Sequence, residues 1–316
     1  MQSSDVIGVF GANGFMGRHL VQRLTTLGLK TISFGREFPA DFYDAVGEGV
    51  ETRRIDITDE LETHVYLQGV THVVQLINTS NPAMGNKHLF SDLMSNVIPH
   101  VSFIQSCVMA DVRHFIFISS GGTVYGLPQQ KPIPETHPTE PLNSYGLGKL
   151  TVEHYLKMLS RGTDLGFSTL RVSNPFGPGQ TSKKGQGLIP EVLKQSAAHA
   201  AVNILGNGQS ERDYIYIEDV IDAIVTCLDH EPLNDVVNIG SGSGRTVLEV
   251  IAAIEQVLQR EIDRHFIDPR TTDTPCNVLD ISKAKALLKW EPRTEFQEAI
   301  RLTVDAYPLG NEHGRL

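Results

Sequence analysis

Residues 6–17 read VIGVFGANGFMG, a short apolar run that passes directly into a glycine-rich turn. The segment that follows, residues 19–27, carries Leu20, Leu24 and Leu27 at helical spacing. A buried parallel strand, a glycine turn and a helix in this order form the phosphate-binding corner of a dinucleotide fold. In this context we favour a bound nucleotide cofactor over the alternative, an ordinary tight turn.

The glycines of this turn are three residues apart, at Gly11, Gly14 and Gly17. Gly11 would allow the tight turn, Gly14 would let backbone N–H groups approach a pyrophosphate, and Gly17 would let the helix pack close to the strand. The helix N-terminus then presents unpaired N–H groups and its positive dipole end to the phosphates. At this corner we expect cofactor contacts from the three glycines and from Asn13, Phe15 and Met16.

The composition of the chain limits the kinds of molecule that it is expected to bind. The 316 residues include 27 Lys and Arg against 37 Asp and Glu, a net charge of −10, which argues against nucleic acid or an anionic membrane as the main partner. Cys107, Cys227 and Cys276 are an odd number, lie far apart and fit a reducing compartment, and we expect no metal site. We find no signal peptide and no apolar run long enough to span a membrane, so we expect a cytoplasmic protein.

Apolar strands alternate with helices along most of the chain, which predicts an α/β fold with a Rossmann-type doubly wound parallel sheet and a smaller C-terminal α/β lobe. Residues 1–175 are expected to form the dinucleotide-binding domain and residues 176–316 mainly a substrate lobe, with residues 210–240 returning to the first domain. Residues 38–50 are interpreted as a loop or a short irregular helix. The predicted strands cover residues 6–10, 30–34, 53–57, 71–77, 114–118, 167–172 and 236–240, and helices near residues 247–259, 282–288 and 295–305 complete the lobe.

Strand ends supply further candidates, because ligands of such sheets bind outside the carboxyl ends of the strands. Arg36 follows the second strand where NAD-binding units often carry a carboxylate, so NADP stays open beside NAD, and a solvated loop arginine is an equal alternative. Asp56 is placed to bind an adenine amine, although Asp is also an ordinary strand-end cap. The remaining contacts expected from these ends are Ile57, Leu76 and Ser119.

Residues 89–110 read as a long helix that Pro99 should kink. Its apolar residues occupy more than one face, which is typical of a helix buried on both sides. One side would contact the sheet. The other would contact a second copy of the chain, so we expect a homodimer.

Tyr145 and Lys149 are four residues apart in the stretch NSYGLGK, residues 143–149. On a helix they therefore share one face, one turn apart. Gly146 and Gly148 are poor helix formers and suggest that another backbone approaches this turn closely. The alternative is an exposed helical pair without a function.

Taken together, these pieces resemble the extended short-chain dehydrogenase/reductases, in their nucleotide-sugar epimerase/dehydratase group. The resemblance covers the chain to about residue 306, and its motifs are the glycine turn, the serine-rich strand end before VYG (residues 124–126), YGLGK (145–149), NPFGP (174–178), RDYI (212–215) and RTTD (270–273). It implies that Tyr145 is the catalytic base and that Lys149 and an oxidised nicotinamide ring both favour its phenolate form. Lys149 would also bind the nicotinamide ribose, and Asn96 would support the active-site backbone.

One position departs from the family pattern. Gly121 stands where the family carries its third catalytic group, a Ser or Thr, so the hydroxyl would come from Ser120, from Thr123 or from water. Gly122 and Thr123 occupy the place where 4,6-dehydratases have an Asp-Glu pair. Dehydration is therefore disfavoured.

The same resemblance implies a substrate lobe that binds a nucleotide diphosphate through Arg212, Arg270 and Asn174, although surface ion pairs with Asp213 or Asp273 are the alternative for the arginines. Asn277 would limit the bulk allowed at the sugar C2 and leave room for an N-acetyl group. We expect an NAD-dependent UDP-hexose 4-epimerase that acts through a transient 4-keto sugar. A reductase or dehydrogenase using NAD or NADP, and a catalytically impaired nucleotide-binding protein, stay open as alternatives.

Overall fold

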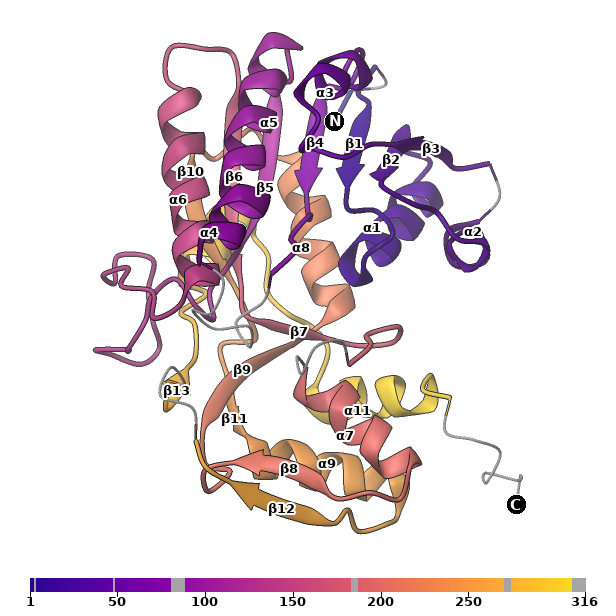
Figure 1. Ribbon diagram of the computed structural model, residues 1–316, viewed down its shortest axis with the longest axis vertical. Helices are drawn as coiled ribbons and strands as arrows, with labels where there is room; N and C mark the ends of the chain where they lie inside the picture. Colours follow the sequence, from indigo (N-terminus) through magenta and orange to yellow (C-terminus); the bar gives the residue numbers. More distant parts are fainter. Residues whose placement is uncertain (3, 48, 81–88, 183–186, 270–273, 309–316) are drawn as a thin grey trace.

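The computed structural model describes residues 1–308 apart from residues 3, 48, 81–88, 183–186 and 270–273. Its larger part is built on a seven-stranded parallel sheet with the order β10-β6-β5-β4-β1-β2-β3 (Figure 1). In that order the strands are β10 (Asp235–Ile239), β6 (Gly166–Val172), β5 (His114–Ser120), β4 (His72–Gln75), β1 (Ile7–Phe10), β2 (Thr31–Gly35) and β3 (Glu51–Arg54). The chain winds outward from β1 in both directions, which confirms the predicted doubly wound α/β class.

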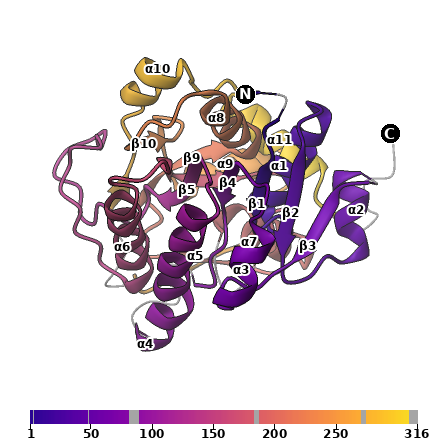
Figure 2. The same cartoon turned by 90° about the horizontal axis from the view of Figure 1, so that it is seen from above.

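Helices cover both faces of this sheet (Figure 2). The helices α3 (Glu60–Tyr66), α5 (Ile98–Met109) and α6 (Ser144–Leu159) lie on one face, and α1 (Phe15–Thr26) and α8 (Ile217–Asp229) lie side by side on the other. Because both faces are covered, the inner strands are apolar almost throughout: all four residues of β1 and all seven of β5 are buried. The segment interpreted as a loop or irregular helix forms α2 (Ala40–Val46), which packs on α1.

The long helix predicted over residues 89–110 is divided into three parts. These are α4 (Leu89–Asp92), a π-helical turn η2 (Leu93–Val97) and α5, whose first turn contains Pro99. Proline is tolerated in a first helical turn, where its missing N–H is not needed. The irregularity therefore precedes Pro99, and the predicted kink at the proline is wrong. Apolar residues such as Phe90 on α4 and Met109 on α5 are exposed in the single chain, so contact of this side with a second copy stays a prediction.

The smaller lobe contains two short sheets. In one of them β9 (Glu211–Tyr216) pairs with β11 (Gly244–Thr246), β13 (Cys276–Asn277) and β7 (Asn174–Phe176). The other joins β8 (Val202–Leu205) to β12 (Arg264–Ile267). The helices of this lobe are α7 (Leu188–Ala197), α9 (Val247–Leu258) and α11 (Phe296–Asp305).

Later segments also return to the large sheet. β10 forms its edge beside β6, and α8 packs on α1. The helix α10 (Ser282–Leu288) was expected in the C-terminal lobe but packs on β10 and α8, where the Lys283 ammonium lies 2.6 Å from the Asp235 carboxylate. Within the described ranges, no helix is both long enough and apolar enough to cross a membrane.

Candidate active site

The carboxyl ends of β1, β4, β5 and β6 open on a cavity of about 640 Å³ between the large sheet and the smaller lobe. Ligands of doubly wound sheets bind at this edge, where loops and helix N-termini converge. The structure brings eleven of the residues expected from the sequence into the lining of this one cavity. They are Gly14, Phe15, Met16, Leu76, Ser119, Ser120, Thr123, Tyr145, Lys149, Asn174 and Arg212.

The glycine turn has the geometry that a bound pyrophosphate requires. Gly11 has a φ of +86°, in the left-handed region, and a Cβ on Gly17 would lie 2.3 Å from the Gly11 carbonyl oxygen. Gly14 is the N-cap of α1 and no side chain caps this helix, so the first backbone N–H groups of α1 lie at the cavity wall. The residues present therefore fit the phosphates of a dinucleotide.

Other predicted cofactor contacts lie outside the cavity lining of the described chain. The Asp56 carboxylate accepts the Thr58 N–H at 3.0 Å and the Thr58 hydroxyl at 2.8 Å, as in an ordinary turn, and Ile57 is buried in the core. Arg36 is exposed immediately after β2. The Asn13 side-chain oxygen accepts an N–H of Arg18 at 2.7 Å. Their cofactor contacts stay predictions.

Asn96 supports the loop after β4 from within the π-helical turn. Its side-chain oxygen accepts the Thr79 N–H at 2.9 Å, and its amide donates to the Ser80 hydroxyl at 3.2 Å. Asn78 and Ser80 of this loop line the cavity. Asn96 thus holds a wall of the site from behind, in agreement with the role that the resemblance implied.

The helix α6 sits directly on the turn after β5. Its N-cap, Asn143, accepts the Gly146 N–H at 2.9 Å, and a Cβ on Gly146 would lie 2.7 Å from the Thr123 carbonyl oxygen. Only glycine allows this approach, which confirms the close contact predicted from the sequence. As a result Tyr145 and Lys149 both line the cavity. The Lys149 ammonium donates to the Ile118 carbonyl oxygen at 2.9 Å and lies 6.0 Å from the centre of the Tyr145 ring.

Burial controls the proton affinity of both groups. It raises the pKa of Tyr145 to about 12, while a hydrogen bond with Ser120 acts in the opposite direction. Burial also lowers the pKa of Lys149 to about 8, against the attraction of Glu153. The phenol therefore keeps its proton at neutral pH in the chain alone. The two positive charges that the resemblance implies, on Lys149 and on a bound nicotinamide ring, would act against this effect of burial.

Ser120 and Thr123 differ in what their hydroxyls contact near the missing third group. A Cβ on Gly121 would lie 2.5 Å from a Leu279 methyl carbon and 3.0 Å from the Arg171 carbonyl oxygen, so a serine there would require the Leu279 side chain to move. The hydroxyl of the preceding residue, Ser120, instead hydrogen-bonds Tyr145. The Thr123 hydroxyl is buried with no hydrogen-bond partner among the described residues. Of the two candidates, Ser120 contacts the phenol and Thr123 is left available for a ligand.

Asn174 and Arg212 lie on the wall of the cavity that the smaller lobe contributes. The Asn174 amide donates to the Asp213 carbonyl oxygen at 2.9 Å. The buried Asp213 carboxylate accepts the Ser241 N–H and hydroxyl, both at 2.7 Å, and the Leu279 N–H at 3.2 Å. This carboxylate is saturated by neutral donors, so the alternative in which Arg212 pairs with Asp213 is not seen in the described part of the chain.

Asn277 is buried against the turn after β5. It is 1% exposed, its amide donates to the Gly121 carbonyl oxygen at 3.1 Å, and it lies behind the cavity lining as described. In the described chain it holds the turn after β5, and its expected contact with the sugar C2 stays a prediction. Arg270 lies outside the described residues.

Sequence reasoning missed part of the lining. Asn78 and Ser80 follow β4, so the rule that ligands bind at the carboxyl ends of strands was sufficient to find them. Asn143 carries the ordinary signal of a helix N-cap. Other missed lining residues include Gln180, Thr181 and Thr274, which come from loops without a recognisable motif. Tyr214 also lines the cavity; it lies in the RDYI motif, but no role was assigned to it.

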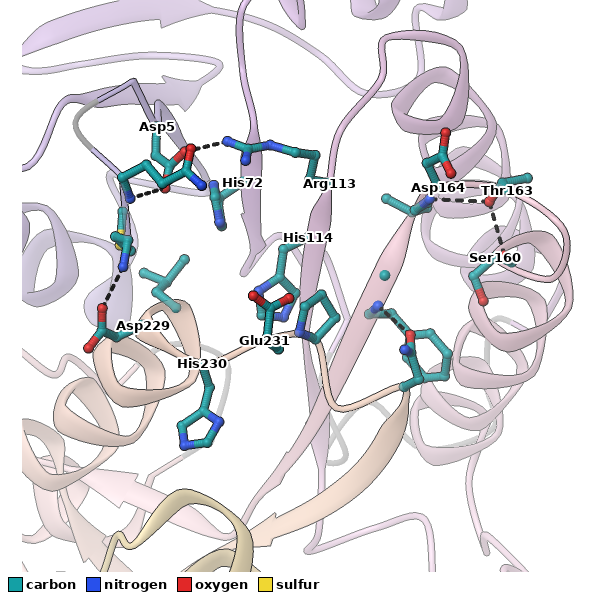
Figure 3. A pocket seen from close by; sticks show the side chains of 18 of the residues that line it. Asp5, His72, Arg113, His114, Ser160, Thr163, Asp164, Asp229, His230 and Glu231 are labelled. Atoms are coloured by element: carbon teal, nitrogen blue, oxygen red, sulfur yellow. Dashed lines mark hydrogen bonds and ion pairs between the residues drawn. The ribbon is translucent and has the colours of Figure 1, made fainter.

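A second cavity, of about 740 Å³, lies at the opposite edge of the sheet, where the strands begin (Figure 3). It is lined by residues such as Asp5, His72 and Arg113, and by the C-terminal end of α8. None of the motifs singled out in the sequence reaches it.

Comparison with known proteins agrees with the geometry. Residues 7–240 match the NAD dependent epimerase/dehydratase family. The chain is 31% identical over 298 residues to a dTDP-4-dehydro-6-deoxyglucose reductase of Escherichia coli, with 92% of this chain and 94% of that protein covered. It is also similar to two crystal structures, in each of which 95% of this chain and 98% of the other is covered. These are a UDP-glucose 4-epimerase of Thermotoga maritima with UDP-glucose (28% identity, TM-score 0.89) and a UDP-glucose 4-epimerase of Thermus thermophilus with NAD (27% identity, TM-score 0.88).

Proposed function

The chain belongs to the NAD-dependent epimerase/dehydratase family, and from that premise we propose that it is a UDP-sugar 4-epimerase. The observation that carries the proposal is the placement of Tyr145, Lys149 and Ser120 in one cavity with the glycine turn and Arg212. UDP-glucose 4-epimerases of the same fold cover nearly the whole chain. A dehydratase is disfavoured, because Gly122 and Thr123 offer no acid and base for the loss of water.

Each residue has a defined task in this reaction. When bound, NAD supplies an acceptor and later a donor of hydride at the sugar C4. Tyr145 as phenolate takes the proton of the 4-hydroxyl. It returns the proton after the 4-keto sugar has rotated in the cavity and presents its other face. Lys149 stabilises the phenolate by its charge, and Ser120 donates a hydrogen bond to the phenolate oxygen. Thr123 offers its unpartnered hydroxyl to the sugar.

Arg212 and Asn174 would bind the diphosphate of the substrate. A guanidinium suits phosphate oxygens because its N–H groups form a planar fork with a permanent charge. Arg270 is proposed as the second cation of this clamp.

The test begins with the ligands that the purified protein carries. Mass spectrometry after denaturation is expected to release NAD. Incubation with UDP-glucose, UDP-N-acetylglucosamine and UDP-glucuronate, followed by NMR, is expected to show the 4-epimer of at least one sugar without net consumption of cofactor. No epimer from any UDP-sugar would contradict the proposal.

A reductase is the second candidate, because the relative that is 31% identical is a dTDP-sugar reductase. It predicts one equivalent of NADH or NADPH consumed for each sugar converted, which absorbance at the nicotinamide band measures. The exposed Arg36 keeps NADP relevant to this alternative. A catalytically impaired nucleotide-binding protein would instead bind cofactor and be indifferent to Tyr145→Phe.

We also propose that the protein is a cytoplasmic homodimer. Exposed apolar side chains lie on neighbouring helices: Phe90 on α4, Met94 on η2, Ile98 on α5, and Leu147 and Met158 on α6. Two such helical pairs would form a four-helix contact. A Leu147→Lys variant is expected to shift the mass measured by light scattering from dimer to monomer, and a monomeric wild type at micromolar concentration would contradict the dimer.

A further inference from the structure

A buried ion pair lies one helical turn below the catalytic lysine. On α6, Tyr145, Lys149 and Glu153 follow at intervals of four residues and so share one face. The Glu153 carboxylate accepts two N–H groups of Arg171 on β6, at 2.6 and 3.1 Å. The exposed fractions of the Arg171 and Glu153 side chains are 6% and 5%, so water does not screen the pair.

The same carboxylate reaches the strand that carries the third hydroxyl. The Ser119 hydroxyl donates to Glu153, and Ser119 immediately precedes Ser120, whose hydroxyl bonds Tyr145. Lys149 donates to the carbonyl oxygen of Ile118, one residue earlier on β5. Three consecutive residues at the end of β5 are therefore each held by a different side chain of α6.

Arg171 is fixed from the other side. Its guanidinium carbon lies 4.8 Å from the centre of the Tyr125 ring, and the Tyr125 hydroxyl donates to the Asn238 side-chain oxygen at 2.6 Å. The network thus runs from the catalytic helix to the edge strand β10. Each of its charged hydrogen-bonding groups has a partner, which is what allows an ion pair to remain buried.

The charges of this buried group do not cancel. Lys149 and Arg171 contribute two positive charges and Glu153 one negative charge, which leaves one positive charge beside Tyr145. The other titratable or charged side chains that act on Tyr145 and Lys149 in the described chain are Asp92 on α4 and His100 on α5. His100 is buried and neutral at pH 7, because burial lowers its pKa to about 4.

We propose that Glu153 is a positioning residue for the catalytic pair: its carboxylate, held by Arg171 and Ser119, keeps Lys149 protonated and fixes the end of β5 that presents Ser120 to Tyr145. The mechanistic consequence rests on the proposed epimerase function. The effect of Glu153 on the ionisation of Lys149 does not rest on that function, because it can be measured whether or not the protein converts a substrate.

The experiment measures that ionisation directly. The full chain, saturated with NAD, is labelled with 13C at the lysine Cε, and the Lys149 signal is assigned by its loss in Lys149→Met. In Glu153→Gln the midpoint of the Lys149 titration is expected to fall by about one pH unit or more, since an opposite charge one helical turn away is lost. The alkaline limb of kcat/KM is expected to move by a similar amount, with the acid limb unchanged.

A second variant covers the case in which Glu153→Gln fails to fold because Arg171 is left buried and unpaired. In Glu153→Gln, Arg171→Met both charges are replaced by neutral groups, which buried pairs often tolerate. Its Lys149 midpoint is expected to fall less than in Glu153→Gln but to stay below the wild type, because the repulsion by Arg171 is lost together with the nearer attraction by Glu153. Asp219→Asn is the matched control: this buried carboxylate on α8 accepts the Arg293 N–H at 2.9 Å, and its loss is expected to leave the Lys149 midpoint unchanged.

The possible outcomes distinguish the positioning role of Glu153 from the proposed epimerase function. An unchanged Lys149 midpoint in both Glu153 variants, or activity lowered equally at every pH, overturns the inference and leaves Glu153 as a structural pair. A shifted midpoint in a protein that epimerises no UDP-sugar supports the inference and contradicts the proposed function.

Discussion

The two edges of the parallel sheet carry cavities of similar size and very different chemistry. The cavity where the strands begin measures about 740 Å³ and the one where they end about 640 Å³, yet only the smaller contains the predicted motifs. Volume therefore does not identify the site. What differs is that the carboxyl edge combines the predicted motif residues with the uncapped start of α1.

At the amino edge several charged groups pair with one another, although Nδ1 of the buried His114 has no partner in the described chain. Arg113 pairs with Asp5, and the N-terminal ammonium of Met1 lies 2.7 Å from the Asp229 carboxylate (Figure 3). At the carboxyl edge, the Thr123 hydroxyl and the Gln180 side-chain oxygen have no partner among the described residues. The start of α1 adds uncapped N–H groups to that edge. Parallel winding places helix N-termini at this edge only, so the asymmetry follows from topology.

The largest expected effect comes from removing the phenol. Tyr145→Phe is expected to lower kcat about 10³-fold, because it removes the group that takes and returns the proton. The measurement is the rate of epimer formation by NMR, with NAD content determined in parallel. Tyr155→Phe, on an exposed part of the same helix, is the matched control and should leave the rate unchanged. A Tyr145→Phe enzyme retaining a tenth of the activity would place the chemistry elsewhere.

The next effect sharpens the assignment of the third hydroxyl. Ser120→Ala is expected to lower kcat about 100-fold, because it removes the hydrogen bond donated to the Tyr145 oxygen. Thr123→Val should lower kcat/KM by only about tenfold, through the loss of one hydrogen bond to the sugar. Steady-state kinetics of the two variants decides the order. The reverse order would assign the catalytic role to Thr123.

The region of these hydroxyls also shows which parts of the site could be predicted from the sequence and which could not. The glycine turn, the alternation of strands and helices, and the Tyr145–Lys149 spacing are local patterns, and each was sufficient to predict its element and its place at the carboxyl edge. The crowding at residue 121, by contrast, comes from Leu279, which is remote in the sequence and lies where a side chain on residue 121 would begin. No local pattern contains that contact.

Two other features of the site have the same origin. The contact of Asn277 with the Gly121 carbonyl oxygen follows from the pairing of β13 with β9, which the sequence did not indicate. The kink expected at Pro99 is replaced by a π-helical turn one element earlier, which places Asn96 against the loop after β4. Both features depend on packing between residues that are far apart in the sequence, and the spacing of apolar residues along the chain does not reveal such contacts.

A third prediction tests the two edges against each other with matched arginines. Arg212→Met at the carboxyl edge is expected to raise KM for the UDP-sugar about 30-fold, because a charge-assisted contact with the diphosphate is lost. Arg161→Met changes the same residue type in the lining of the amino-edge cavity and should change KM less than about twofold, within the scatter of a surface substitution. A comparable rise in both variants would mean that the amino edge also binds the substrate.

The smallest expected effect is on the free energy of unfolding at acid pH, through a histidine that lines the amino-edge cavity. His114 is buried at the start of β5, with Nε2 2.9 Å from the Ser168 hydroxyl and Nδ1 without a partner in the described chain. Burial lowers its pKa to about 3, whereas the pKa of a histidine in the unfolded chain is about 6.5. Below about pH 6.5 the unfolded state therefore binds a proton that the folded state does not. The free energy of unfolding must fall as the pH falls.

For His114 this loss amounts to about 1 kcal/mol between pH 7 and pH 5.5, since each proton of difference contributes about 1.4 kcal/mol per pH unit. His114→Gln is expected to remove that part of the slope in urea unfolding measured at the two pH values. His230→Gln, at an exposed histidine lining the same cavity, should retain the wild-type slope. If His114→Gln keeps the full slope, the acid sensitivity arises at other histidines, such as the buried His100 beside Lys149, and belongs to the catalytic edge instead.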